Sequence, residues 1–189
     1  MRERIRDRAH TILSPLTRLI LKYRISPVLI SLAGLPFNLL AGYLFFKGRF
    51  PLAGLFLIIG GFFDTIDGEV ARKGNRVTLA GGFLDSTLDR FSEFFVYLGL
   101  FLYYFPSPLT ILLFNVFFLS LMVSYLRARS EGAGMECRIG VFDRTVRVIV
   151  LAMGAILLPR SLFPVILWIL LAGISFTVIQ RIIYVLKRL

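Results

Sequence analysis

Six apolar stretches divide most of the chain, and they restrict its possible folds more than any other feature. They cover residues 26–46, 50–66, 82–104, 108–126, 145–158 and 162–186. Most approach the roughly 20 residues that a helix needs to cross a bilayer. With 57% hydrophobic residues and a mean hydropathy of +0.80, the chain differs from an ordinary soluble domain. The pattern predicts an all-α integral membrane bundle of six transmembrane helices, formed by residues 25–189.

Residues 1–24 are expected to form a separate arm at the membrane surface. One face of a predicted helix after Pro15 is apolar and consists of Leu16, Leu19, Ile20 and Tyr23. Arg18 and Lys22 lie opposite this face, as in a helix that rests in the interface between lipid and water. The sequence therefore predicts an N-terminal interfacial amphipathic helix.

Lysine and arginine gather on one side of the predicted bundle. Seven lie up to Arg24, three within 72–76, five within 127–147 and three from Arg181 onward, against three on the opposite side. Positive residues favour the cytoplasmic side of a membrane protein. We therefore expect a multi-pass protein of the plasma membrane with both termini in the cytoplasm. The net charge of +11 then requires no nucleic-acid partner.

Four aspartates lie close to the predicted cytoplasmic boundary. Asp64 and Asp67 are three residues apart near the end of the second apolar stretch, so they share one helical face. After a short turn, Asp85 and Asp89 are four residues apart and again share a face. Two neighbouring antiparallel helices are thus expected to present four carboxylates at about the same depth. Ionisable residues in such positions are expensive and mark functional sites.

Four carboxylates at such close range repel one another, so a positive charge is expected between them. Hard oxygen ligands of this kind suit Mg²⁺ or Mn²⁺. The alternative is that the acids pair with Arg72, Arg76 and Arg90 and only cap the helix ends. Because four acids coincide at two helical spacings beside small residues, we favour a metal site.

The acids belong to a longer pattern, Asp64-x2-Asp67-Gly68-x2-Ala71-Arg72-x8-Gly81-x3-Asp85-x3-Asp89, with eight fixed residue types over 26 positions. This pattern resembles the signature of the CDP-alcohol phosphotransferases, membrane enzymes of phospholipid synthesis. The resemblance implies a six-helix fold that usually forms a homodimer. It also implies transfer of the phosphatidyl-type group of a CDP-linked lipid to an alcohol, with release of CMP.

The same resemblance implies a role for each member of the pattern. Two divalent metal ions would be held by Asp64, Asp67, Asp85 and Asp89, and Asp89 would also be the catalytic base. The CDP nucleotide would be bound by Asp64, Asp67, Gly68, Ala71, Arg72, Gly81 and Asp85. These roles suit the chemistry, because a two-metal clamp offsets charge on a pyrophosphate and a base activates the attacking hydroxyl.

A second pattern concerns the alcohol that accepts the group. The sequence SYLRARSE at 124–131, a glycine-containing loop and Asp143-Arg144-x2-Arg147 follow one another. They resemble the branch of phosphatidylinositol-phosphate synthases from actinobacteria and archaetidylinositol-phosphate synthases from archaea, although Asp143 stands where glutamate is usual. Aspartate there also suits the N-cap of the fifth helix.

This branch resemblance implies inositol 1-phosphate as the acceptor. Its phosphate would be bound by Ser124, Arg127, Arg129 and Arg181. Arg181 also interrupts an apolar helix, where a charge needs a partner such as a phosphate. The alternative for Arg127 and Arg129 is that they extend to lipid phosphates at the membrane surface.

Two other functions stay open at this point. Glycerol 3-phosphate would need a similar number of arginines, so the same chemistry with this acceptor is the nearest alternative. A divalent-cation transporter is a remote alternative, because transport sites lie near the bilayer midplane on broken helices. Here the acids gather at one interface, and the second half of the chain has no matching set.

Overall fold

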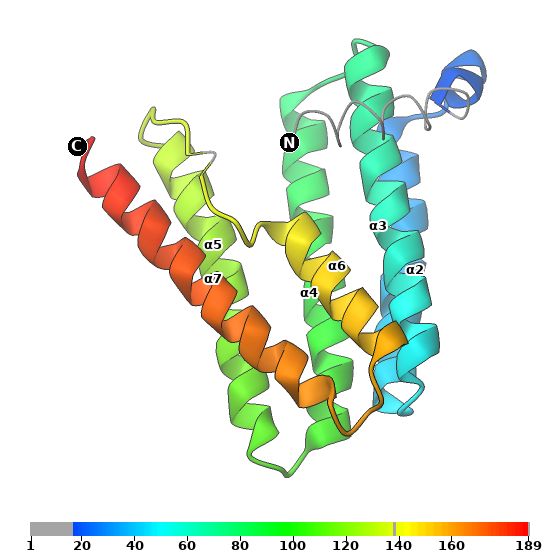
Figure 1. Ribbon diagram of the computed structural model, residues 1–189. Coiled ribbons are helices and arrows are strands. Elements are labelled where there is room, and N and C mark those ends of the chain that lie inside the picture. Colours follow the sequence, from blue (N-terminus) through cyan, green and yellow to red (C-terminus); the bar gives the residue numbers. More distant parts are fainter. Residues whose placement is uncertain (1–16, 138, 189) are drawn as a thin grey trace.

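Six long helices account for most of the described chain (Figure 1). The structure is a computed structural model that describes residues 17–137 and 139–188, and within these ranges all regular structure is helical. The helices are α2 (Pro27–Phe46), α3 (Phe50–Lys73), α4 (Leu79–Tyr104), α5 (Leu109–Glu131), α6 (Arg144–Leu157) and α7 (Phe163–Leu186). A short helical segment also covers residues 17–22. The all-α prediction is confirmed, and each predicted apolar stretch coincides with one long helix.

Local sequence signals explain where several helices begin. α2, α3 and α7 each carry a proline in the first or second helical position, where its missing N–H costs no hydrogen bond. The Thr78 hydroxyl caps α4 by accepting a hydrogen bond from the Gly81 amide at 3.0 Å. The Asp143 carboxylate caps α6 in the same way, with the Val146 amide as donor at 3.1 Å. The predicted N-cap at Asp143 is therefore confirmed.

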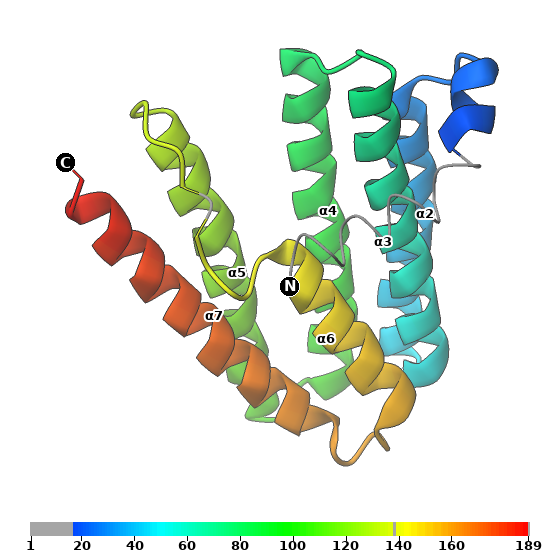
Figure 2. The same ribbon diagram turned by 45° about the horizontal axis from the view of Figure 1, so that its top comes forward.

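The helices pack in two groups that are joined along a narrower contact. α2 packs along both α3 and α4, and α3 also packs against α6. α5 and α7 pair with each other and contact α4 and α6 less extensively. Figures 1 and 2 show the α5–α7 pair leaning away from α2, α3 and α4 toward the end at which the described C-terminus lies. The position of α5 and α7 relative to α4 therefore depends on few contacts.

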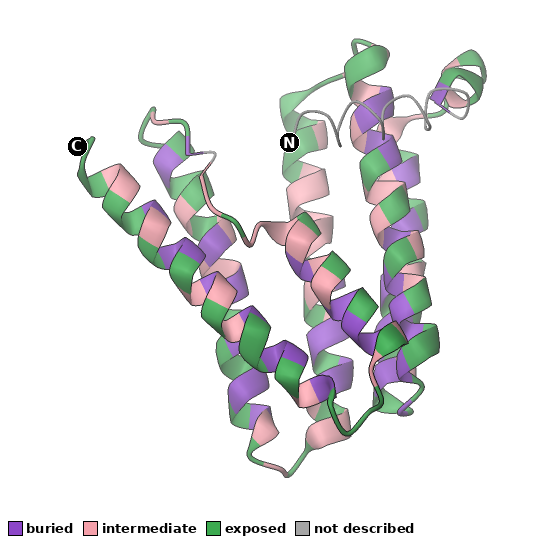
Figure 3. Ribbon diagram, viewed as in Figure 1, coloured by how far each residue is buried: buried purple, intermediate pink, exposed green. Residues whose placement is uncertain are grey.

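The core is apolar, and so is much of the outer surface. Phe45, Phe50 and Phe163 meet where α2 turns into α3 and where α7 begins, with ring centroids 4.7–5.9 Å apart. Large apolar side chains such as Phe114 and Trp168 are exposed on the outer faces of α5 and α7. Exposed stretches follow the outside of the long helices in Figure 3. An outer surface of this kind suits contact with lipid.

Four helices, α2, α3, α5 and α7, are long and apolar enough to cross a membrane. α6 has 14 residues, a rise of about 21 Å at 1.5 Å per residue, which is shorter than the roughly 30 Å hydrocarbon core. α4 is long enough, but it carries Asp85, Asp89 and Arg90 in its first half and Glu93 just past its middle. The structure therefore supports a membrane protein, while the full set of six spans stays a prediction.

The predicted N-terminal arm lies partly outside the described residues. Leu16 belongs to the part that is not described. Ile20 and Leu21 pack against a small cluster formed by Ile30, Ile66 and Val70. The segment 17–22 is thus held against α2 and α3, and its place at a membrane surface stays a prediction.

We predict that Gly99→Ala lowers the thermal stability of the detergent-solubilised protein. An added Cβ at Gly99 would overlap the carbonyl group of Gly42, where the backbones of α2 and α4 meet. Overpacking of this kind costs about 1–3 kcal/mol. The control is Gly61→Ala, whose Cβ would meet only Val148 Cγ1, at 3.7 Å. Equal unfolding midpoints for the two variants would contradict the proposed backbone contact.

Candidate metal and nucleotide site

Aspartates from two helices bring their carboxylates together at one end of the bundle. Asp64 and Asp67 lie in the last part of α3, and Asp85 and Asp89 lie in the first half of α4. One carboxylate oxygen from each of Asp64, Asp67 and Asp85 lies within 4.8 Å of the others. Asp89 lines the same cavity. The structure thus places all four predicted acids around one space and gathers three of them closely.

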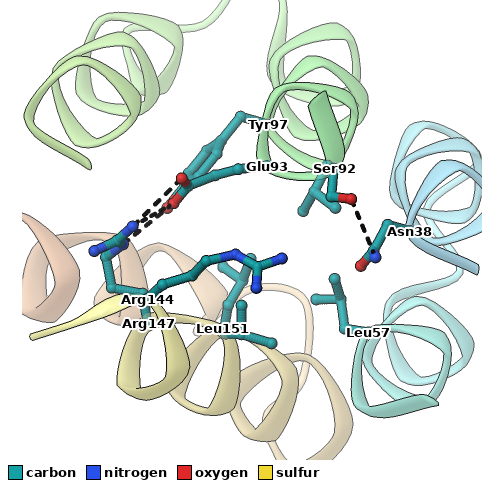
Figure 4. Close-up of a pocket in the computed structure, with 10 residues that line it drawn as sticks. Asn38, Leu57, Ser92, Glu93, Tyr97, Arg144, Arg147 and Leu151 are labelled. Carbon is teal, nitrogen blue, oxygen red and sulfur yellow. Dashed lines mark hydrogen bonds and ion pairs between the residues drawn. The ribbon is translucent and has the colours of Figure 1, made fainter. Parts of the chain in front are cut away.

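α2 supplies polar groups to this cavity. The Ser31 hydroxyl donates a hydrogen bond of 2.5 Å to Asp67 Oδ2, and Asp67 is only 4% exposed. Deeper in the bundle, Asn38 Nδ2 donates to the Ser92 hydroxyl of α4 at 3.4 Å, as Figure 4 shows. The Ser31 contact thus restrains Asp67, and Asn38 and Ser92 line the same cavity.

Arg144, the first residue of α6, reaches acids on both α3 and α4. Its Nη1 donates to Asp64 Oδ2 at 2.7 Å and lies 2.8 Å from Asp89 Oδ1. Arg90 also lies 3.5 Å from Asp89. Among the described residues, neither Asp67 nor Asp85 has an ion-pair partner. The arginine side chains near the cluster therefore lie beside Asp64 and Asp89.

The donor set and charge of the cluster fit a divalent cation. Asp64, Asp67 and Asp85 offer only carboxylate oxygens, which are the ligands that Mg²⁺ and Mn²⁺ prefer. The oxygens are close enough to approach one ion together. Partly buried carboxylates also repel one another unless a cation offsets their charge. The residues present thus fit the predicted metal.

The alternative in which arginines merely cap these acids receives limited support. Arg90 does approach Asp89, as that alternative expected. Arg76 Nη1 instead donates to the carbonyl groups of Arg24 and Ile25 at 3.3 and 3.4 Å. The Arg72 guanidinium lies beside Gly68. Within the described chain, neither Arg72 nor Arg76 forms an ion pair with the four aspartates.

A larger groove adjoins the acid cavity. It has a volume of about 820 Å³ and is lined by α2, α3, the turn before α4 and α4, together with Arg127 of α5. Of the seven predicted nucleotide-binding residues, six line it: Asp67, Gly68, Ala71, Arg72, Gly81 and Asp85. Asp67 and Asp85 also line the acid cavity. A ligand in the groove would therefore lie against the acid cluster.

Two glycines of this region, Gly81 and Gly68, lack a side chain for different local reasons. A Cβ at Gly81 would come within 2.9 Å of the Thr78 hydroxyl, which caps α4. Gly81 therefore serves the start of the helix, whatever the groove holds. A Cβ at Gly68 would meet the movable end of the Arg72 side chain at 3.1 Å. Gly68 thus leaves room between the α3 backbone and that guanidinium.

The four predicted acceptor residues are less closely gathered. Arg127 lines the groove and pairs with Glu131 at 2.8 Å. Arg129 is exposed, and Ser124 is half-buried. Arg181 is 4% exposed. Its Nε donates to the Ile139 carbonyl at 2.9 Å, and its Nη1 donates to the Val123 carbonyl.

Sequence reasoning missed several residues of the site. It matched Arg144 to a family element but did not place it between Asp64 and Asp89. It gave no role to Ser31 or Asn38. The available signal for Arg144 was its position directly after the N-cap Asp143, which carries the side chain at the very start of α6. A partner for Ser31 could not be read from spacing, because it lies 36 residues from Asp67.

Comparison with known proteins gives one family. The family model described as CDP-alcohol phosphatidyltransferase matches residues 24–179. Archaetidylinositol phosphate synthase of Methanothermobacter thermautotrophicus is 42% identical over 152 residues, which are 79% of this chain and 76% of that protein. The protein of the same name from Pyrococcus horikoshii is 34% identical and is aligned over 100% of this chain and 98% of its own length.

Solved structures show the same fold. The crystal structure of Mycobacterium tuberculosis phosphatidylinositol phosphate synthase with CDP-DAG bound is similar with a TM-score of 0.82 and 27% identity, over 93% of this chain and 94% of that chain. A structure of that protein in complex with manganese and citrate has a TM-score of 0.81, also at 27% identity, and covers 90% of this chain and 87% of that one.

We predict that Asp67→Asn lowers the affinity for Mn²⁺ at least about tenfold, because even outer-shell changes at metal sites cost 10–100-fold. The measurement is titration of free Mn²⁺ by electron paramagnetic resonance in detergent. The matched control is Glu131→Gln, which removes an exposed acid that pairs with Arg127 outside the cavity. Wild-type affinity in Asp67→Asn would show that the ion is held elsewhere.

Proposed function

The chain belongs to the CDP-alcohol phosphatidyltransferase family, and we propose that it transfers a phosphatidyl-type group from a CDP-linked lipid to inositol 1-phosphate. The group is a diacyl- or dialkylglycerol phosphate, and CMP is released. The chain is thus a transferase of phospholipid synthesis. Its relatives named archaetidylinositol phosphate synthase support the choice of an inositol phosphate as acceptor.

The observation that carries the proposal is the contact between groove and acid cluster. Asp67 and Asp85 line both spaces. A nucleotide lying in the groove against Gly68 and Ala71 would place its phosphates beside the carboxylates. The groove volume of about 820 Å³ lies within the usual range of small-molecule sites.

Asp64, Asp67 and Asp85 are assigned to hold the divalent metal, with Asp89 beside it. When bound, Mg²⁺ or Mn²⁺ supplies positive charge that offsets the negative charge of the pyrophosphate and of the departing CMP. Ser31 holds Asp67 in place through its hydrogen bond. Arg144, at the start of α6, restrains the Asp64 carboxylate.

Asp89 is assigned as the base. It takes the proton from the acceptor hydroxyl, whose oxygen then attacks the phosphorus that carries the lipid. The bond between this phosphorus and the bridging pyrophosphate oxygen breaks, and CMP leaves with the bond's electron pair. Arg144 and Arg90 both approach the Asp89 carboxylate and orient it within the cavity.

The acceptor phosphate is assigned to Arg127, Arg129, Arg181 and Ser124. Arg127 borders the groove and supplies a guanidinium near the nucleotide. Arg181 already donates to two backbone carbonyls, but a guanidinium has five N–H donors, so these bonds do not exhaust it. Several fixed guanidinium groups are needed to hold a dianionic phosphate near four carboxylates.

The membrane arrangement is part of the proposal. All six long helices cross the bilayer, α6 together with the flanking residues 139–143 and 158–162, because its own 14 residues are too short. The site faces the cytoplasm, and the protein forms a homodimer. α4 can cross despite its charges because Asp85, Asp89 and Glu93 line interior cavities. The excess of lysine and arginine at the site's end of the bundle supports a cytoplasmic site.

We predict that Asp89→Asn lowers transfer at least about 100-fold, which is the lower range for loss of a general base. Its Mg²⁺-dependent affinity for CMP should stay within about threefold of wild type. The same substitution at Asp67 should lower both. These quantities are measured by CMP release and by isothermal titration. If Asp89→Asn lowered the transfer rate and the CMP affinity equally, Asp89 would be assigned only as a metal ligand.

The acceptor is tested with the solubilised protein, Mg²⁺ and CDP-diacylglycerol or its isoprenoid ether counterpart. Inositol 1-phosphate, inositol and glycerol 3-phosphate are offered separately, and CMP release is measured. Release with inositol 1-phosphate alone is expected. Release with glycerol 3-phosphate alone would overturn the acceptor assignment. Failure of the wild type to bind CMP with Mg²⁺ or Mn²⁺ would contradict the nucleotide site and favour cation transport.

A further inference from the structure

A buried ion pair lies deeper in the bundle than the acid cluster and joins α4 to α6. Arg147 donates to Glu93 Oε1 through Nε at 3.2 Å and through Nη2 at 3.0 Å, and Nη2 lies 3.3 Å from Oε2. Figure 4 shows the two side chains joined by dashed lines in the wall of a pocket. The Ser120 hydroxyl of α5 donates to the same Glu93 oxygen at 2.5 Å. Arg147 is 2% exposed and Ser120 is fully buried.

The hydrogen bonds continue from this pair to α7. Arg147 Nη1 donates to the Phe142 carbonyl at 3.2 Å, in the loop that precedes α6. The Phe142 amide donates to the Thr177 hydroxyl at 3.0 Å, and that hydroxyl donates to the Gly173 carbonyl at 2.9 Å. We call the set of Glu93, Ser120, Arg147, Thr177 and the Phe142 backbone the interhelical network. It connects α4, α5, α6 and α7.

Each side chain of the network lies one helical turn from a residue of the proposed site. The pairs are Asp89 with Glu93, Ser124 with Ser120, Arg144 with Arg147, and Arg181 with Thr177. Residues three or four positions apart share a helical face. Fixing the network therefore fixes the direction in which the site residues of all four helices point.

The network lies where direct packing is weak. α4 and α6 do not pack extensively against each other, and the contacts of α4 with α5 and of α6 with α7 are fewer than those inside each group. The metal residues lie on α3 and α4, whereas the proposed acceptor residues lie on α5 and α7. The relative position of these two sets depends on the junction that the network spans.

A buried ion pair contributes little to the free energy of unfolding, because apolar side chains of similar size often stabilise a protein equally well. A fully hydrogen-bonded polar network does specify one geometry, because any shift leaves a buried group unpaired. Catalysis needs such precision, since a misplacement of about 1 Å can cost 100-fold in rate.

We propose that Glu93 and Arg147 are positioning residues that hold the acceptor-binding helices α5 and α7 in register with the metal-bearing helices. Their kinetic effect rests on the proposed function. The groove is lined by α2, α3 and α4, and Arg127 alone comes from α5. Loss of the network should therefore weaken use of the acceptor while leaving nucleotide binding nearly unchanged.

The test is the double variant Glu93→Leu/Arg147→Met, which removes both charges together so that neither is left buried alone. We expect the KM for inositol 1-phosphate to rise at least about tenfold, with Mg²⁺-dependent CMP affinity within about threefold of wild type. Wild-type KM, or an equal loss of CMP affinity, would overturn the proposal.

A milder pair of variants covers the case in which the double variant does not fold. Thr177→Val removes a hydroxyl that accepts the loop amide and should also raise the acceptor KM. Thr110→Val is the control, because its hydroxyl donates to a carbonyl of the preceding turn outside the network and is also nearly buried. Equal acceptor KM values in these two variants would contradict the positioning role.

A distance measurement separates this proposal from the proposed function. Spin labels are attached at Leu79→Cys and Leu186→Cys, two exposed positions at the start of α4 and the end of α7, after Cys137, the only cysteine, is replaced by alanine. The double variant should broaden the label-to-label distance distribution, even if the wild type transfers no group at all. An unchanged distribution would overturn the positioning role.

Discussion

Charge compensation between the aspartates of α3 and α4 is the constraint on which the rest of the structure depends. Carboxylates held partly away from water repel one another. Arg90 approaches one of them, Asp89, and a second arginine, Arg144, joins the two helices. Arg144 reaches both Asp64 and Asp89 because Asp143 caps α6 directly before it. Asp67 and Asp85 line the groove. A divalent cation bound there can offset the negative charge of both these carboxylates and the phosphates of a nucleotide.

The two groups of helices carry different parts of the site. α2, α3 and α4 build the acid cavity and most of the groove. α5 and α7 carry the residues assigned to the acceptor. α6 lies between the groups, with Arg144 beside the acid cavity and Arg147 about one helical turn further along the helix. A lipid-linked donor and a water-soluble acceptor can meet only at an end of such a bundle. The charges of α4 therefore lie at that end and point inward, where they cost less than in lipid.

Much of this could be predicted from the sequence. The apolar stretches predicted the six long helices, and spacings of three and four indicated that Asp64, Asp67, Asp85 and Asp89 lie together, as the cavity that all four line confirms. Contacts between distant helices could not be predicted, because spacing says nothing about how far a side chain reaches across a bundle. Arg181 is the clearest case. The sequence indicated only that its charge needs a partner such as a phosphate. It could not indicate the two carbonyl groups that also accept hydrogen bonds from it, those of Ile139 in the loop before α6 and of Val123 in α5.

The most direct test of the account is anomalous X-ray diffraction from crystals of the protein grown in lipid and soaked with Mn²⁺ and CMP. The account predicts anomalous peaks in the cavity between α3 and α4, with oxygens of Asp64, Asp67 and Asp85 as neighbours and the CMP phosphate on the groove side. Ordered CMP with no peak in that cavity, or peaks bound only by other residues, would contradict it.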